Sequence, residues 1–364
     1  MQDASCCTEF FARVRNLLDE AQVPYRSSEI SGGPQGAQCN TLRLQIPGVE
    51  RRRVLRAFQE LQRLGWPVIV RDRVSSACWR YTFRLAVSNS ALEVATIELS
   101  CGEHRGRIIN LIHSIRRWLR PAGACIVLLG PDGAGKSTMS ARLVQALSPV
   151  FQDSMIFQWR PQLLKPRAPT PPNVFNPPHS FPRHNALLSF MRLGGIVADY
   201  WYAEVVLIRG LLARPGLVLF DRDFHDILVD AERYRYGGSM WVARILQRFV
   251  PHSDRLVLVL EASPDAILAR KQELPRQELL RQSYEYRRLA EQLPSAVVVR
   301  TDQHAAGCLE EALIAVTDYL AERCHELGFR KSLEPSFDPR HTQSAGAQAA
   351  ECRVDQGTTL GSRR

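Results

Sequence analysis

The stretch CIVLLGPDGAGKSTM, residues 125–139, decides the fold. It opens with five apolar residues, as expected of a strand that is buried on both faces of a sheet. A glycine-rich turn follows, and the next residues, STMSARLVQAL, have the composition of a helix. A strand, a glycine turn and a helix in this order predict the first unit of a parallel α/β sheet. The turn fits the pattern G-x-x-x-x-G-K-[ST] through Gly130, Gly135, Lys136 and Ser137.

This turn has the chemistry of a phosphate cradle. Glycines allow backbone N–H groups to point inward, and the amino end of the following helix adds positive potential. Lys136 would supply a mobile charge, and Ser137 would bind magnesium. Because 43 of the 47 basic residues are arginine, a lysine here indicates a need for a compact ammonium group. A glycine turn without a nucleotide is the alternative. The residues expected around an ATP molecule are Gly130, Asp132, Gly133, Ala134, Gly135, Lys136, Ser137 and Thr138.

Four more apolar runs follow at the spacing of β–α units. Runs that are apolar on both faces are typical of a parallel sheet covered by helices. We therefore predict a doubly wound α/β P-loop domain over residues 121–328. Its insert at residues 160–183 holds eight of the 22 prolines and is expected to be extended and poor in helix. The runs are SMIFQW (154–159), GLVLFD (216–221), RLVLVLE (255–261) and AVVVRTD (296–302).

A smaller α+β domain is predicted before it, over residues 1–120. Helical periodicity marks residues 10–23 and 50–64, and alternating apolar and polar residues mark the strands TLRLQI, CWRYTFRLAV and LEVATIEL. The segment LRPAGAC then separates the two domains. Residues 329–364 have few large apolar side chains and are expected to be a disordered tail.

A second informative stretch is FDRDFHDILVD, residues 220–230. Asp221 ends an apolar strand, where a carboxylate can hold magnesium through water, and Arg222 offers a planar fork for a phosphate. Asp223 stands where a helix cap belongs, and Asp226 and Asp230 follow on one helical face. These last three could form a metal cage, but a solvated or arginine-paired face is favoured. Only proximity supports His225 as a base.

Two of these motifs resemble those of thymidylate kinases. GPDGAGKST is similar to G-x-[DE]-G-[AS]-G-K-[ST]-T, and FDRDF is similar to D-R-[YF]. The resemblance implies that Asp132 faces the acceptor sugar and that Arg222 contacts the acceptor and the transferred phosphate. WRP, similar to R-E-P, would make Arg160 a ligand of the acceptor phosphate. SPDAILARKQELPRQELLRQSYEYRRLA resembles a mobile lid that would bring Arg270 and Arg276 onto the phosphates.

The chain also departs from that family. Asp223 replaces the aromatic residue of D-R-[YF], and the insert and the first domain are additional. The whole resembles larger thymidylate kinase-like proteins with HDLLVDPxRYRYGG-type sequences, which are often linked to bacterial surface-polysaccharide genes. The first domain resembles a nucleotidyltransferase fold, but it lacks the paired carboxylates that hold two metal ions. We expect it to be inactive and to serve binding or assembly.

The composition of the whole chain bears on the cellular location of the protein and on the partners that it could bind. The nine cysteines are scattered and form no C-x-x-C pair, as in a reduced cytoplasmic protein, and the first residues lack the pattern of a secretory signal. The apolar segment at 194–213 is interrupted by Asp199, Glu204 and Arg209, so we expect a partly buried helix and no transmembrane segment. The net charge of +10 is spread along the chain and indicates a basic surface without a nucleic-acid motif.

Together these features favour a phosphotransferase of the nucleoside-monophosphate-kinase type. It would use ATP and Mg²⁺ to phosphorylate dTMP or a related phosphorylated small molecule, and the resemblance implies a homodimer. Lys136, Arg222, Arg270 and Arg276 would be catalytic, and Ser137 and Asp221 would bind the metal. The alternative is an ATP-binding regulator or scaffold without kinase activity that serves surface-polysaccharide synthesis.

Overall fold

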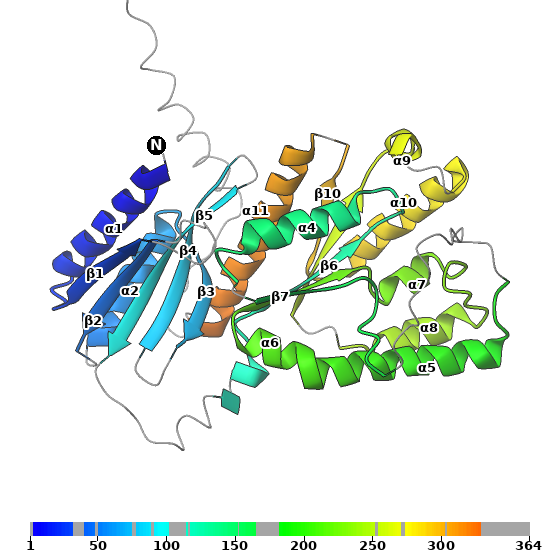
Figure 1. Cartoon of the computed structure of the whole chain (residues 1–364), viewed down its shortest axis with the longest axis horizontal. Helices are drawn as coiled ribbons and strands as arrows, with labels where there is room; N and C mark the ends of the chain where they lie inside the picture. Colours follow the sequence, from blue (N-terminus) through cyan, green and yellow to red (C-terminus); the bar gives the residue numbers. More distant parts are fainter. Residues whose placement is uncertain are drawn as a thin grey trace, which may run out of the picture.

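The computed structural model contains two five-stranded sheets, one in each half of the chain (Figure 1). The described residues are 3–31, 40–47, 50–74, 78–88, 91–101, 114–115, 117–151, 153–164, 182–251, 254–270, 274–302 and 304–328. The predicted tail at 329–364 and residues 165–181 of the predicted proline-rich insert lie outside this set.

The first sheet is mixed and has the strand order β1-β2-β5-β4-β3. Strands β2 and β5 run parallel, whereas the other neighbours are antiparallel. The predicted helices and strands are present, but α1 begins well before residue 10, and β1, with the polar sequence RSSEIS, was not predicted. The elements are α1 (Asp3–Glu20), β1 (Arg26–Ser31), β2 (Asn40–Ile46), α2 (Arg51–Arg63), β3 (Val68–Arg73), β4 (Cys78–Ser88) and β5 (Ala91–Cys101).

The second sheet is fully parallel and has the order β10-β9-β6-β8-β7. This arrangement confirms the predicted α/β fold class, and it places the strand before the glycine turn at the centre of the sheet. The strands are β6 (Ala124–Leu129), β7 (Asp153–Phe157), β8 (Gly216–Asp221), β9 (Arg255–Glu261) and β10 (Ala296–Arg300). The helices are α4 (Lys136–Leu147), α5 (Ala186–Ala203), α6 (Arg209–Ala213), α7 (His225–Val229), α8 (Met240–Gln247), α9 (Pro264–Arg270), α10 (Arg276–Gln292) and α11 (Ala305–Gly328).

Helices cover both faces of this parallel sheet, which explains its apolar strands. Every residue of β6 and β8 is buried. Ile126 and Leu128 of β6 pack with α4 and α11, whereas Cys125, Val127 and Leu129 pack with α5, α8 and α10. Alternate residues of one strand thus enter two separate cores, as a doubly wound sheet requires.

Helix α11 joins the two halves of the molecule. It lies between the two sheets (Figure 1), and residues from β3 and β5 share an apolar core with residues of α4, β6 and α11. Arg84 of β4 reinforces the contact by donating to the Thr317 hydroxyl at 2.7 Å. The predicted boundary near residue 120 therefore separates two sheets that are joined by shared apolar packing.

The two acidic residues of the apolar segment at 194–213 are buried, and each has a hydrogen-bond donor. Asp199 accepts hydrogen bonds from the backbone N–H groups of residues 162–164, at 2.7–2.9 Å. Glu204 begins a π-helical turn, η3 (Glu204–Ile208), and accepts from Arg209 Nε at 2.8 Å. No helix in the described part of the chain is long and apolar enough to cross a membrane.

Candidate functional site: a phosphate-binding loop beside an arginine–carboxylate cluster

The glycine turn occupies the carboxyl end of β6, where two of its glycines are structurally required. Gly130 has φ 141°, and a Cβ atom there would lie 2.5 Å from the Leu260 carbonyl oxygen of β9. Gly135 has φ 93° and is the cap of α4, which begins at Lys136. L-residues rarely adopt such angles, so glycine is needed to turn the chain from strand to helix this tightly. The amino end of α4 consequently borders the loop.

Lys136 is buried in this loop, with only 5% of its surface exposed. Its Nζ donates to the carbonyl oxygens of Gly130, at 2.6 Å, and Pro131, at 2.8 Å, and lies 3.7 Å from the Asp132 carboxylate. Burial and the charge of Arg222 lower the pKa of Lys136 to about 8, although Asp132 opposes the shift. Carbonyl contacts within the loop thus hold a compact ammonium group.

Ser137 and Asp221, the two residues predicted to bind magnesium, are hydrogen-bonded to each other. Asp221 is the last residue of β8, next to Leu128 of β6, and its Oδ2 accepts a hydrogen bond from Ser137 Oγ at 2.6 Å. Its other oxygen, Oδ1, is buried and has no hydrogen-bond partner among the described residues. Magnesium prefers oxygen ligands and takes one or two carboxylates together with phosphate oxygens and water, so this pair fits the ion.

Arg222 follows in a strained conformation. Its φ is 85°, and its N–H donates to the Leu128 carbonyl oxygen at 3.0 Å. The side chain donates to Asp132 through Nη2, and its Nε lies 3.2 Å from Asp226 Oδ2. Burial lowers the pKa of this guanidinium, but Asp226 and Asp132 outweigh burial and hold the pKa above its ordinary value. The unusual backbone angle places the arginine between the glycine loop and α7. Strained backbone angles of this kind are concentrated at functional sites.

Asp132 is shared by three cations. Its Oδ1 accepts from Arg222, its Oδ2 accepts from Arg233, and Lys136 lies close by. Burial would raise the pKa of Asp132, but these charges hold it well below its usual range. Each carboxylate oxygen of Asp132 thus accepts a hydrogen bond from one arginine. The sequence did not single out Arg233, although it lies in the RYRYGG segment that carries the resemblance.

The other aspartates of residues 220–230 are buried, so the prediction of a solvated face was wrong. Asp226, 1% exposed, accepts from the hydroxyl groups of Tyr286, at 2.9 Å, and Tyr234, at 3.2 Å, in addition to its pairing with Arg222. Asp230 accepts from Gln282 Nε2 at 3.1 Å. Burial raises the pKa of Asp226 to about 6, against the opposing charges of Arg222 and Lys136. The arginine-paired alternative therefore holds for Asp226.

Asp223 and His225 form a buried pair. Asp223 Oδ1 accepts from the His225 backbone N–H at 2.8 Å and lies 2.9 Å from His225 Nδ1. Gln247 Nε2 lies 2.9 Å from the other ring nitrogen. The carboxylate therefore fixes the first turn of α7, although Phe224 occupies the formal cap position. Both ring nitrogens of His225 are therefore engaged with protein side chains.

The metal cage that was the less favoured alternative is not formed by these aspartates. Within the described ranges, no three side chains of the His, Cys, Asp and Glu types are grouped closely enough to hold a metal ion. Asp223 is turned toward His225, whereas Asp226 is turned toward two tyrosines and Arg222. The aspartates of this stretch thus have separate roles, because each carboxylate meets a different set of donors.

The remaining predicted arginines contact residues outside the glycine loop. Arg160 lies 3.9 Å from Asp199, and its guanidinium stacks over Trp159, which in turn stacks on Tyr234. Arg270 donates to the Thr301 carbonyl oxygen at 2.8 Å, and the exposed Arg276 pairs with Asp265. The structure therefore connects Arg160 to the cluster through aromatic rings and leaves the two lid arginines on other partners.

The candidate site lies where the strand order of the parallel sheet reverses. From β6 the chain passes to β7 and β8 on one side, and then to β9 and β10 on the other. In open α/β sheets such a switch point leaves a crevice at the carboxyl ends of the strands, where ligands bind. Fold and site together define a parallel α/β protein with a glycine-rich loop between its central strand and the following helix.

Comparisons with known proteins give a likeness only among solved structures. No protein-family model and no curated protein sequence matches the chain. A thymidylate kinase from Ehrlichia chaffeensis aligns at 15% identity and a TM-score of 0.36, covering 54% of this chain and 99% of that one. A thymidylate kinase from Candida albicans aligns at 18% identity and a TM-score of 0.37, covering 55% and 93%.

Proposed function

We propose that the chain is an ATP- and magnesium-dependent phosphotransferase of the nucleoside-monophosphate-kinase type. It would transfer the γ-phosphate of ATP to dTMP or a related phosphorylated acceptor. The pairing of Ser137 with Asp221 beside Lys136 carries this proposal, because one Asp221 oxygen is buried without a partner at the edge where phosphates would lie. The location in the cytoplasm and the assembly as a homodimer remain predictions from the sequence.

The donor half of the reaction would use the glycine loop. Lys136 would exchange its carbonyl partners, Gly130 and Pro131, for the β- and γ-phosphate oxygens. A magnesium ion held through Ser137 and Asp221 would neutralise charge on those oxygens. Because phosphoryl transfer depends mainly on positioning and charge stabilisation, a preformed loop of this kind supplies much of what the reaction needs.

The acceptor half would use arginines that are now bound to carboxylates. Arg222 and Arg233 both hold Asp132, and a phosphate that entered between them could take over these contacts. Arg160 would bind the acceptor phosphate, and Arg270 and Arg276 would move onto the phosphates when a lid closes. The buried Asp223 is turned toward His225, so its charge need not repel an acceptor nucleotide.

One observation favours a nucleotide-dependent regulator or scaffold instead. Each of the arginines proposed to meet phosphate already has a protein partner, and Arg222 is held by two carboxylates. A protein that only binds ATP could keep these pairs intact and use them to hold α7 in place. In that case ATP would switch contacts to a partner in surface-polysaccharide synthesis, and no phosphate would be transferred.

Phosphate transfer from labelled ATP decides between the two functions. The acceptors to test are dTMP, the other nucleoside monophosphates, and sugar and lipid-linked phosphates. A kinase gives a labelled product that is lost in Lys136→Ala and in Asp221→Asn. Arg142→Ala is the matched control, because Arg142 lies on the same helix α4 and its guanidinium donates to the Ala305 carbonyl oxygen at 3.2 Å.

The results of the phosphate-transfer assay distinguish the kinase from the regulator. Transfer to none of the acceptors, with ATP binding that depends on Lys136, supports the regulator. Transfer that is undiminished in Lys136→Ala contradicts any role for the glycine loop. Lys136→Arg adds a further test, since a planar guanidinium keeps the charge but is not expected to replace the compact ammonium group.

A further inference from the structure

A cavity of about 530 Å³ lies at the other end of the parallel sheet from the glycine loop. Arg255, which lines it, is the first residue of β9, and Ser295 directly precedes β10. Because the strands are parallel, these amino ends lie opposite the carboxyl ends that carry Gly130 and Asp221. Asp223 and His225, which follow the carboxyl end of β8, also line the cavity, but no residue of the glycine loop does, and neither Asp221 nor Arg222 does. The size of the cavity suits a small organic molecule.

Arg255 is the unusual residue of this cavity. It is 7% exposed, and neither of its terminal nitrogens, Nη1 and Nη2, has a hydrogen-bond partner among the described residues. Glu204 Oε2 lies 3.6 Å from Nη2, but Glu204 already accepts from Arg209 at 2.8 Å. The Phe220 ring lies 5.0 Å from the guanidinium carbon. A buried guanidinium with an open donor fork is costly, because it has lost the hydrogen bonds of water without replacing them.

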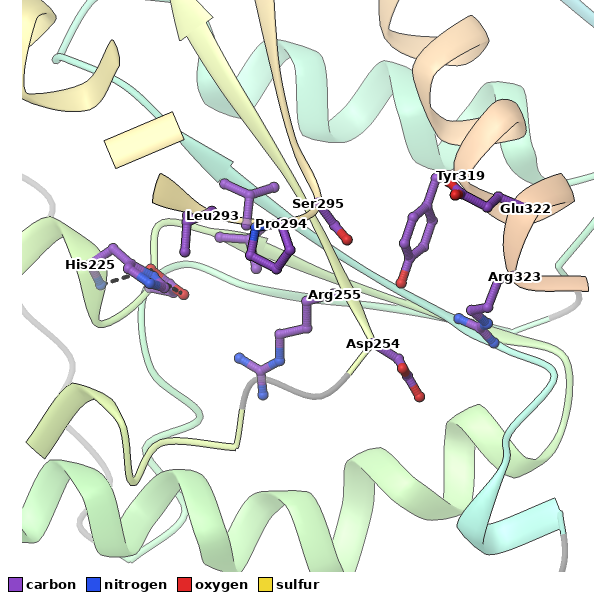
Figure 2. Close-up of a pocket in the computed structure, with 12 residues that line it drawn as sticks. His225, Asp254, Arg255, Leu293, Pro294, Ser295, Tyr319, Glu322 and Arg323 are labelled. Atoms are coloured by element: carbon purple, nitrogen blue, oxygen red, sulfur yellow. Dashed lines mark hydrogen bonds and ion pairs between the residues drawn. The ribbon is translucent and has the colours of Figure 1, made fainter. Parts of the chain in front are cut away.

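The other side chains of the cavity divide into an apolar wall and a polar mouth. Figure 2 shows side chains entering from several elements, with Arg255 and Asp254 at the start of β9 and Tyr319, Glu322 and Arg323 on α11. The apolar part of the wall is formed by Val127, Val257, Leu293 and Pro294, and the buried pair of Asp223 and His225 adjoins it. The mouth carries the exposed carboxylates Asp254 and Glu322.

These features define the chemistry of a ligand. We propose that the cavity binds a small organic anion whose carboxylate or phosphate group accepts hydrogen bonds from the two terminal nitrogens of Arg255. A planar guanidinium matches either oxyanion through two parallel hydrogen bonds. The body of the ligand lies against the apolar wall, and its hydroxyl or amine groups donate to Asp254 and Glu322.

The charges around the cavity restrict the ligand further. Arg323 donates through Nη2 to the carbonyl oxygens of Pro121, at 2.7 Å, and Gly123, so part of its donor capacity is already used. Asp254 and Glu322 would repel a ligand that carried several negative charges. A compact anion with one acidic group is therefore favoured over a nucleoside triphosphate, and the cavity is not a second ATP site.

Binding at this cavity would not depend on phosphate transfer. Its wall includes the Asp223–His225 pair, and Asp223 adjoins Arg222 of the candidate active site. A bound anion would therefore lie behind the segment that carries Arg222. The proposal stands on the cavity and on Arg255, so it holds whether the chain is a kinase or a regulator.

Calorimetric titration of the intact chain tests the proposal. Four probes combine the two acidic groups with two kinds of body: phenyl phosphate, benzoate, glucose 1-phosphate and gluconate. At least one probe is expected to bind one site with a Kd below about 1 mM. Phenyl phosphate against benzoate, and glucose 1-phosphate against gluconate, show whether the site prefers a phosphate or a carboxylate group. The first two probes against the last two show whether it prefers an aromatic ring or a hydroxyl-bearing chain.

Three variants locate the binding. Arg255→Met removes the fork and keeps the length, and affinity should fall at least about tenfold, a loss of one good charge-assisted contact. Ser295→Phe fills the cavity without changing Arg255 and should also abolish binding, so it decides the question if Arg255→Met does not fold. Lys136→Ala disables the glycine loop and should leave binding unchanged. Absence of binding for all four probes, retention in both cavity variants, or loss in Lys136→Ala would overturn the proposal.

Discussion

Replacement of Asp226 by asparagine should stabilise the protein at neutral pH. Asp226 is buried on α7 and receives hydrogen bonds from Tyr286 and Tyr234 as well as the charge of Arg222. Even with these partners, burial raises the pKa of its carboxyl group from 3.8 to about 6. Folding thus shifts the equilibrium of this carboxyl group toward its neutral form, which asparagine resembles in shape and polarity.

The pKa values give the sign and the size of the effect. Between about pH 4 and 6 the unfolded chain has lost the Asp226 proton while the folded chain keeps it, so stability falls as pH rises through this window. Above pH 6 the loss is complete. It amounts to roughly 3 kcal/mol for a difference of about two pKa units. The Asp226→Asn variant escapes this loss, and its advantage over the wild type should grow from near zero at pH 4 to about 3 kcal/mol at pH 7.

Urea unfolding from pH 4 to pH 7.5, followed by circular dichroism, measures the difference. Tyr286→Phe is the matched control, because it removes a hydrogen bond that favours the charged carboxylate. This variant should lose more stability than the wild type over the same pH range, so the two substitutions have opposite signs. A constant difference between Asp226→Asn and the wild type at every pH would refute the reasoning about a raised pKa.

Two further predictions concern the glycine loop. Gly130→Ala should cost about 2–5 kcal/mol and remove nucleotide binding, because its Cβ atom meets the Leu260 carbonyl oxygen and its φ is strained. Thermal unfolding checks this against Gly195→Ala, an open helical position on α5, where about 0.4–1 kcal/mol of stabilisation is expected. Because the pKa of Lys136 is about 8, this residue should take up roughly half a proton when phosphates bind at pH 8. Calorimetry in buffers of different ionisation enthalpy measures this uptake. Its absence would contradict the role of Lys136 as a phosphate ligand.

The sequence predicted those residues of the candidate site that lie close together in the chain. The glycine loop, Lys136 and Ser137 lie within eight residues, and the preceding strand fixes their position at the carboxyl edge of the sheet. Asp221 was predicted because an apolar strand ends there. That its carboxylate meets Ser137 follows from the adjacency of β6 and β8, which the sequence does not specify but the sheet order provides.

Burial and long-range pairing could not be read from the sequence. Asp226 and Asp230 look solvent-exposed at a helical spacing of four residues, yet α10 covers them with Tyr286 and Gln282. Arg233 lies 101 residues after Asp132, and no local pattern joins the two. Sequence periodicity shows which residues share a face, but not which distant element covers that face.

The arginine–carboxylate cluster connects the proposed reaction to these buried charges. Arg222 stands between Asp132 and Asp226, so its charge is balanced before any phosphate arrives. Removal of one carboxylate from a buried pair leaves an uncompensated charge, whereas its replacement by a phosphate does not. An incoming phosphate can therefore displace Asp132 while Asp226 keeps hold of Arg222 through Nε. The two carboxylates on Arg222 would therefore have different roles. Asp132 can be exchanged for a phosphate, and Asp226 keeps the arginine side chain in place.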